Sequence, residues 1–186
     1  MNQRALRQFN CHDQEQPSWF DRAERAASLI APLAARTPRR RLSVSDIGCG
    51  DMKLRQFLES AGLNCAYQGY DLVPQHPAVA ALDIRVQPLP VPTDVAVMLG
   101  VVEYLDNLAQ VLERLAGEVH WLLLSHVVSD YSVYTPSKLQ ELGWMNHLAR
   151  KDFGELLSSS GFAIEAEQLT SNGRTVLWLC RPASSI

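Results

Sequence analysis

The segment SVSDIGCGDMKL, residues 43–54, places an acid and two glycines directly after a short apolar-leaning run. A strand that turns through Gly-x-Gly into a helix lets the backbone approach a ligand closely, because glycine carries no Cβ. The first turn of the following helix offers unpaired N–H groups and a positive dipole end, which suit a carboxylate or a phosphate. The pattern therefore predicts a binding loop for a charged ligand around Asp46, Gly48, Cys49 and Gly50.

Two common nucleotide-binding motifs do not fit this loop. The dinucleotide fingerprint Gly-x-Gly-x-x-Gly requires a glycine at position 53, where the chain has Lys53. The phosphate loop that ends in Gly-Lys-Ser or Gly-Lys-Thr is missing from the sequence as well. Nicotinamide dinucleotides and nucleoside triphosphates are therefore disfavoured as ligands.

Two further acids follow the next expected strands. The run CAYQGY is followed by Asp71 and Leu72, and a third strand near residues 79–83 ends at Asp83 and Ile84. A carboxylate after the second strand can accept two hydrogen bonds from a ribose diol. Asp83 and the backbone N–H of Ile84 suit the amino group and a ring nitrogen of adenine. Three strand ends thus offer partners for an amino acid, a ribose and an adenine, which are the three parts of S-adenosylmethionine (SAM).

These motifs, in this order, resemble those of the class I SAM-dependent methyltransferases over about residues 43–181. The first motif of that family is roughly apolar-x-Asp-x-Gly-x-Gly-x-Gly, and the chain matches it up to Met52, which replaces the third glycine. The run DVAVMLGVVEYLDN is similar to the fourth-strand motif of the family, which implies that the cofactor passes near Leu99 and Gly100. The resemblance implies SAM as cofactor and S-adenosylhomocysteine (SAH) as product, and it implies cofactor contacts at Asp46, Gly48, Cys49, Gly50, Asp71, Leu72, Asp83, Ile84, Leu99 and Gly100.

Methyl transfer is an in-line displacement at a sulfonium carbon, so the protein mainly positions and desolvates the reactants. A base is needed only where the acceptor loses a proton, and the candidates lie beyond the fourth and fifth strands. Glu103 and Tyr104 also suit the start of a helix, and a lone histidine such as His126 is more often structural. His147 fits a catalytic and a structural role equally well, because it lies in the aromatic-polar stretch GWMNHL. The catalytic candidates are therefore His147, His126 and Tyr104.

The elements that must position these residues alternate between helix and strand, which predicts a mainly parallel sheet covered on both faces. We expect a helix from Ser18, as N-cap, to Arg36, a short helix before the third strand, and an irregular stretch from Ser129 to Leu148. The predicted fold class is α/β, a Rossmann-like three-layer sandwich. The resemblance implies a seven-stranded sheet of order 3-2-1-4-5-7-6 with strand 7 antiparallel. One domain is expected over 1–186, with a cap segment and helix in 1–40 and the core in 41–182. Trp19 and Phe20 of that helix fit either a cover over the cofactor or the core contacts of a surface helix.

Composition narrows the class of protein. The 186 residues carry a formal charge of −3, which does not favour nucleic acid as a partner. The four cysteines lack Cys-x-x-Cys spacing, so we expect a reduced, cytoplasmic location. Metal-dependent members of the resembled family need clustered carboxylates near the fourth and fifth strands, and the run LLLSHVVSD offers a single acid, Asp130, so we expect no metal. No apolar run approaches the length of a membrane span.

The run ELGWMNHLARKDFGELLSSSGFAI resembles a late segment of small bacterial members of the family, whose acceptors are small molecules or sugars. The leading hypothesis is therefore an enzyme that methylates oxygen or nitrogen of such an acceptor, as a monomer or homodimer that binds neither DNA nor membranes. One alternative is a catalytically inactive relative that serves as an interaction or regulatory protein. Another is a methyltransferase acting on RNA or protein.

Overall fold

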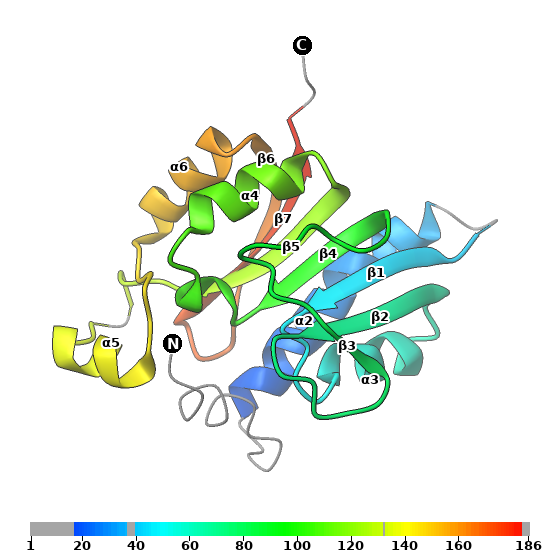
Figure 1. The fold of residues 1–186 in the computed structure, drawn as a ribbon, viewed down its shortest axis with the longest axis horizontal. Coiled ribbons are helices and arrows are strands. Elements are labelled where there is room, and N and C mark those ends of the chain that lie inside the picture. The colour runs from blue at the N-terminus through cyan, green and yellow to red at the C-terminus, as the bar shows by residue number, and fades with distance from the viewer. Residues whose placement is uncertain (1–16, 37–39, 132, 184–186) are drawn as a thin grey trace.

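Seven strands form one mixed sheet in the order β3-β2-β1-β4-β5-β7-β6 (Figure 1). The computed structural model describes residues 17–36, 40–131 and 133–183. The predicted strand order is confirmed, and so is the antiparallel strand β7, which pairs with β5 and β6. The strands are β1 (Leu42–Ile47), β2 (Cys65–Asp71), β3 (Val79–Ala81), β4 (Thr93–Leu99), β5 (Val119–Val127), β6 (Phe162–Leu169) and β7 (Thr175–Pro182).

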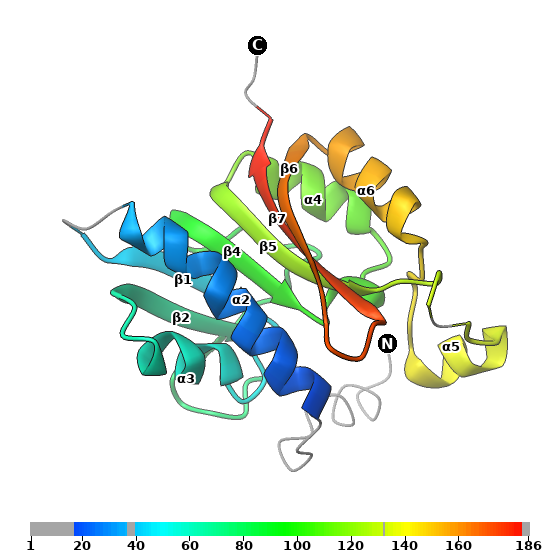
Figure 2. The ribbon, with the colours of Figure 1, turned by 180° about the vertical axis from the view of Figure 1, so that it is seen from behind.

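The helices of the described residues are α2 (Pro17–Ala35), α3 (Lys53–Ser60), the 3₁₀ turn η1 (Val102–Tyr104), α4 (Leu108–Ala116), α5 (Pro136–Leu142) and α6 (Arg150–Ser159). Helices α4 and α6 cover one face of the sheet, and α2 and α3 cover the other (Figures 1 and 2). A buried apolar cluster lies on each face, with Leu112 and Phe153 in one and Ile30 and Leu58 in the other. The central strands β4 and β5 are nearly continuous apolar runs because both of their faces are covered. None of the described helices is both long and apolar enough to cross a membrane.

Two helix predictions were wrong. Helix α2 begins at Pro17, so Ser18 lies inside the helix and is not its N-cap. Proline suits the first helical position, because its fixed φ fits a helix and its missing N–H would have had no partner there. The short helix expected before β3 does not form, and the segment with Pro74 and Pro77 consists of bends and turns. Strand β3 is also shorter than expected and ends at Ala81, two residues before Asp83.

The stretch expected to be irregular, residues 129–148, contains helix α5. Thr135 caps this helix, since its side chain accepts a hydrogen bond from the Lys138 N–H at 3.3 Å. Pro136 follows as the first helical residue, and Gly143 ends the helix with a φ of 70°. These start and stop signals are visible in the sequence, but the helix is only seven residues long and buries none of its side chains.

The parallel pairing brings the carboxyl ends of several strands to one edge of the sheet. Asp46 of β1 lies opposite Gly69 of β2, and Asp71 at the end of β2 lies opposite Ala81. On the other side of β1, Asp46 pairs with Val97, two residues before the end of β4. The acids and glycines singled out in the sequence therefore gather at this edge.

Candidate functional site

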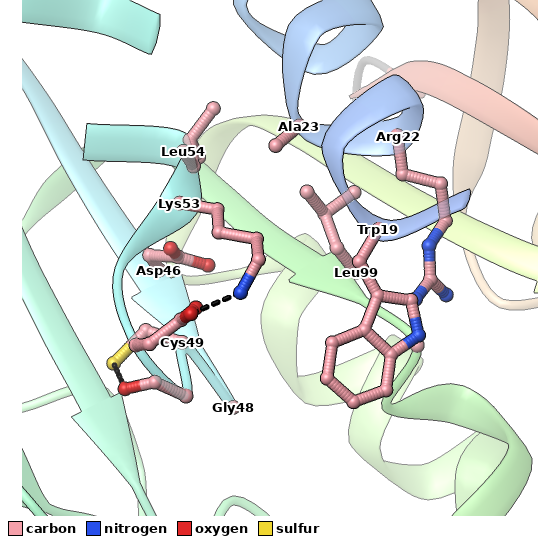
Figure 3. A pocket seen from close by; sticks show the side chains of 12 residues that line it. Trp19, Arg22, Ala23, Asp46, Gly48, Cys49, Lys53, Leu54 and Leu99 are labelled. Carbon is pink, nitrogen blue, oxygen red and sulfur yellow. Dashed lines mark hydrogen bonds and ion pairs between the residues drawn. The ribbon is translucent and has the colours of Figure 1, made fainter. Parts of the chain in front are cut away.

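Two adjoining cavities lie at the carboxyl ends of β1, β2 and β4. The loop cavity is lined by the glycine loop together with Trp19, Arg22, Lys53 and Leu99 (Figure 3). The residues that line the acid cavity include Asp71, Leu72, Asp83, Ile84 and Tyr104. Gly48 and Gly100 belong to both cavities, so the two meet there. Each of the ten residues expected to contact the cofactor lines one of these cavities.

The glycine loop depends on backbone conformations that side chains disfavour. Gly48 has a φ of +70°, and a Cβ at this position would lie 2.4 Å from Cγ2 of Val101. Gly50 also has a positive φ, of 51°. Met52 is the only non-glycine residue with a positive φ among the described residues, and it precedes the first turn of α3. The position at which the family has a third glycine therefore keeps the left-handed backbone, at a cost of roughly 1–2 kcal/mol for a non-glycine residue.

Asp46 lies beneath the loop and is almost completely buried, with 3% exposure. The hydroxyl of Tyr67 donates a hydrogen bond to its Oδ2 at 2.7 Å. Burial raises the pKa of Asp46 to about 7, and the neighbouring carboxylates of Asp71 and Asp51 act in the same direction. Asp46 therefore changes its charge near neutral pH, directly under the place where a ligand would enter.

The other two acids are held by local contacts. Asp71 accepts the N–H groups of Gly50 and Val73 at 3.2 and 3.1 Å, which links the end of β2 to the glycine loop. Asp83 accepts two hydrogen bonds from the guanidinium of Arg85, at 2.8 and 2.6 Å. These bonds hold the pKa of Asp83 below its usual value. An adenine amino group at Asp83 would therefore have to share the carboxylate with Arg85.

Two cations of the loop cavity were not identified as site residues in the sequence. The Nζ of Lys53 forms an ion pair with Asp51 and lies 5.5 Å from the ring centroid of Trp19. Arg22 packs over Gly100, because a Cβ on that glycine would lie 2.6 Å from Nη1 of Arg22. The Nε of Arg22 is buried and has no hydrogen-bond partner among the described residues. Arg22 could not be assigned to this site from local sequence, because its position depends on how α2 crosses the sheet. Trp19, which was considered as a cover for the cofactor, lines the loop cavity.

The candidate bases occupy different environments. Tyr104 is half-buried, its hydroxyl accepts the Trp144 indole N–H at 3.2 Å, and burial raises its pKa to about 12. His147 is also half-buried, and its ring centroid lies 5.4 Å from that of Tyr134 and 5.7 Å from that of Trp144. We call Tyr104, Tyr134, Trp144 and His147 the aromatic cluster. In the part of the chain that the structure describes, no histidine lines either cavity.

His126 lies in the interior, with no exposed surface, and its ring stacks on Phe153 at a centroid distance of 4.6 Å. Its Nε2 accepts the Leu148 N–H at 3.0 Å, so the ring proton lies on Nδ1. That nitrogen is 3.3 Å from Oε1 of Glu103, which is itself 1% exposed and accepts the Val127 N–H at 2.9 Å.

The backbone of Glu103 adds a second link to the same region. Its carbonyl oxygen accepts the N–H groups of Met145 and Asn146, at 2.6 and 3.1 Å. The Asn146 side chain in turn donates to the carbonyl oxygens of Val102 and Leu105, at 2.8 and 2.6 Å. The pair of Glu103 and His126 thus fastens the segment 144–148, which carries part of the aromatic cluster, to the end of β4.

The described residues contain no group of three or more His, Cys, Asp or Glu side chains arranged to hold a metal ion. The acids of the two cavities have backbone N–H, hydroxyl, ammonium or guanidinium partners: Asp71, Asp46, Asp51 and Asp83, respectively.

Comparison with known proteins gives matches for the fold alone. Neither a family model nor a curated protein matches the sequence. Magnesium protoporphyrin IX methyltransferase (ChlM) from Synechocystis PCC 6803, solved with bound SAH, aligns with a TM-score of 0.64 and 17% identity over 96% of this chain and 93% of its own. 1,6-Didemethyltoxoflavin-N1-methyltransferase from Burkholderia thailandensis, solved with bound 1,6-didemethyltoxoflavin and SAH, aligns with a TM-score of 0.65 and 18% identity over 87% of this chain and 79% of its own.

A Haloferax volcanii protein in complex with the Trm112 methyltransferase activator aligns with a TM-score of 0.67 and 13% identity, over 91% of this chain and 96% of its own. At these identities the likeness concerns the arrangement of strands and helices, which agrees with the observed order β3-β2-β1-β4-β5-β7-β6. The chain therefore has the Rossmann-like fold of the class I SAM-dependent methyltransferases.

Proposed function

We propose that this chain is a SAM-dependent methyltransferase that acts on a small-molecule acceptor. The observation that carries the proposal is the gathering of all ten expected cofactor residues around two cavities that meet at Gly48 and Gly100. The solved structures with the same fold include methyltransferases with bound SAH, one of them together with a small-molecule substrate. The formal charge of −3 disfavours nucleic acid as acceptor.

The residues present fit SAM part by part. Asp71 stands at the end of β2, where its carboxylate suits a ribose diol, and the acid cavity continues to Asp83 and Ile84 on the side expected for adenine. The loop cavity, with Gly48 and Gly50, suits the amino-acid end. When bound, SAM would supply the electrophilic methyl group. The protein's own part is then to hold the reacting groups in line and to exclude water from them.

The acceptor side is proposed to lie between α2 and the segment 129–148. Tyr104 lines the acid cavity and contacts Trp144, so the aromatic cluster begins where the cavities meet the end of β4. In this proposal Tyr104 and His147 line the acceptor path. His126 instead holds the segment next to His147 in place, because it is completely buried and accepts the backbone N–H of Leu148.

Calorimetry with SAH tests the proposed function. We expect the wild-type protein to bind SAH, and we expect Asp71→Ala to weaken binding at least tenfold, because hydrogen bonds to a charged group contribute roughly 1.5–3 kcal/mol each. Asp130→Ala is the matched control, since Asp130 lies outside both cavities and accepts the Arg150 N–H. Failure of the wild-type protein to bind SAH would contradict the proposed function. An unchanged affinity in Asp71→Ala would contradict the ribose assignment alone.

We also propose that no metal ion takes part. Chelation with EDTA is expected to leave SAH binding and methyl transfer unchanged. Activity that is lost on chelation and restored by Mg²⁺ would contradict this part of the proposal.

A further inference from the structure

The guanidinium of Arg22 lines the loop cavity and has no bonded counter-ion among the described residues. It packs over Gly100, where the two cavities meet, and its buried Nε has no hydrogen-bond partner among the described residues. A buried donor without a partner is costly, and most such groups in folded proteins are satisfied by protein, water or ligand. Because Nε itself is covered, a ligand would reach Nη1, which faces Gly100 where the two cavities meet. Arg22 therefore points to a ligand that brings an acceptor atom to that end of the guanidinium.

The two cations of the loop cavity differ in this respect. Lys53 projects from the glycine loop and is paired with Asp51, whereas Arg22 projects from α2, and Figure 3 shows the Trp19 indole between them. Lys53 is thus on the side of the loop, next to the expected amino-acid end of the cofactor. Arg22 is on the side of Gly100, where it interacts electrostatically with the carboxylate of Glu103, the residue that precedes Tyr104 of the aromatic cluster.

The expected position of the sulfonium makes this arrangement informative. The resemblance to methyltransferases implies that the reacting end of SAM passes near Leu99 and Gly100. A guanidinium and a sulfonium in one partly buried site repel each other unless an anion lies between or beside them. The carboxylate of Glu103 is near enough to attract the guanidinium of Arg22. Its Oε1, however, accepts the Val127 N–H, and no hydrogen bond joins Glu103 to Arg22.

We propose that Arg22 binds an oxyanion of the methyl acceptor, so that the acceptor is an organic acid or an acidic aromatic hydroxyl and is methylated on oxygen. This inference rests on the proposed methyltransferase function and names the acceptor class for it. The aromatic cluster beside Arg22 supports a planar acceptor, because aromatic side chains pack well against flat rings. The lack of a histidine along the described walls of both cavities also fits an acceptor that arrives without a proton to lose.

The step balances without a base. A lone pair of the acceptor oxygen forms the new O–C bond while the S–C bond breaks and its electron pair stays on sulfur. The anion and the sulfonium become a neutral ester or ether and a neutral thioether, so no proton moves. Because the negative charge disappears during the step, Arg22 stabilises the bound anion more than the transition state, and its contribution is to acceptor affinity and ionisation.

The test measures the affinity of the SAH-loaded protein for matched pairs of probes by NMR titration. The pairs are benzoate with benzamide and 2-naphthoate with 2-naphthamide, which represent organic acids. Acidic aromatic hydroxyls are represented by 4-nitrophenol, titrated across a pH series in which it changes from the neutral phenol to the phenolate. In the wild-type protein each anion is expected to bind more tightly than its neutral partner. Arg22→Met is expected to weaken binding of the anion roughly 10- to 100-fold, the usual size for a charged hydrogen bond, and to leave the amide unchanged.

Two variants keep the test decisive. Arg22→Lys retains the charge and is expected to restore part of the preference for anions. Arg25→Met, one turn along α2, removes an arginine whose partners are Asp21 and Ser171, and it is expected to change no probe affinity. A kinetic readout follows with any anion that proves to be methylated, where Arg22→Met is expected to raise KM without lowering kcat.

Three outcomes would overturn the inference. The first is a wild-type protein that binds each amide as tightly as its anion. The second is an Arg22→Met variant with unchanged anion affinity. The third is an Arg22→Met variant that loses SAH affinity while it keeps the affinity for 5′-methylthioadenosine, because Arg22 would then serve the carboxylate of the cofactor. SAH binding by the wild-type protein is measured first, so failure of the proposed function is recognised separately.

Discussion

The cofactor side and the acceptor side of this site are built in different ways. On the cofactor side, Asp46, Gly48 and Asp71 lie at strand ends within 26 consecutive residues, and neighbouring parallel strands bring them together. On the acceptor side, the segment 144–148 is held to the end of β4 by Glu103 and His126, which come from elements about 20 to 45 residues earlier in the chain. Local sequence therefore specifies one side, and long-range contacts specify the other.

The largest effect on SAH affinity in this comparison is expected on the cofactor side, in Gly48→Ala. A Cβ here would meet Val101 at 2.4 Å and would also force a side chain into a positive φ. Overpacking of this kind costs typically about 1–3 kcal/mol, so we expect SAH affinity to fall roughly 10- to 100-fold. Calorimetry with SAH measures this loss.

Gly62→Ala provides the control for Gly48→Ala. Gly62 has a φ of +65°, but a Cβ there would have nothing within 4 Å. This variant is expected to lose about 1 kcal/mol of stability from backbone strain and no SAH affinity. Equal loss of affinity in both variants would show that strain in the fold, and not close approach at the loop, limits binding.

The second prediction concerns pH. The pKa of Asp46 is about 7 in the folded protein and about 4 when unfolded, so the folded state holds more protons between these values. The free energy of unfolding should therefore fall as the pH rises from about 4 to about 7 and change no further above it, by at most roughly 4 kcal/mol from this group. Asp46→Asn should remove this fall, as measured by urea unfolding across the pH range.

Asp94 gives the contrasting case, since it lies near the amino end of β4, away from the carboxyl ends of the strands that carry the site. Hydrogen bonds from Arg40 hold its pKa well below the usual value, so its stabilisation is present above about pH 4 and is lost as the pH falls further. Asp94→Asn should therefore reduce the loss of stability in acid and leave the fall between pH 4 and 7 intact. If Asp46→Asn behaved in the same way, the assignment of the raised pKa to Asp46 would be wrong.

The difference between the two sides also explains what the sequence could predict. The glycine loop and the acids at 46, 71 and 83 follow from local patterns, because strand ends and turns depend on nearby residues. The strand order was predicted only through the resemblance of these motifs to a known family. Arg22 escaped prediction because its place over Gly100 depends on the path of α2 across the sheet. Helix α5 was overlooked although Thr135 and Gly143 mark its ends, since a short helix without buried side chains shows no apolar periodicity.

A smaller effect is expected on the acceptor side, in Glu103→Gln. The variant keeps an acceptor for the Val127 N–H but removes the charge that faces Nδ1 of His126. Leaving buried polar groups unmatched costs roughly 1–3 kcal/mol. We expect lower stability and faster hydrogen exchange at the amides of Asn146 and Leu148, with SAH affinity unchanged.

Glu155→Gln is the control for Glu103→Gln, because Glu155 is an exposed partner of Lys151 on α6 and should change stability by less than about 0.5 kcal/mol. A loss of SAH affinity in Glu103→Gln as large as in Gly48→Ala would show that the two sides of the site are one cooperative unit.

The smallest effect on the rate is expected in His147→Ala. If the acceptor arrives as an oxyanion, no proton has to be removed. The rate of SAH formation, measured with an organic acid that the protein methylates, should therefore change only a few-fold. The variant still loses ring contacts with Tyr134 and Trp144, which contribute about 0.5–1.5 kcal/mol to stability in pairs of this kind. His120→Ala serves as the control, since His120 is exposed at the start of β5. If His147 acts as a base, His147→Ala would instead lower the rate by about 10²–10⁴-fold at unchanged SAH affinity. That result would assign proton transfer to the aromatic cluster and would replace the oxyanion acceptor by one that carries a proton, because a base is useful only where a proton must leave.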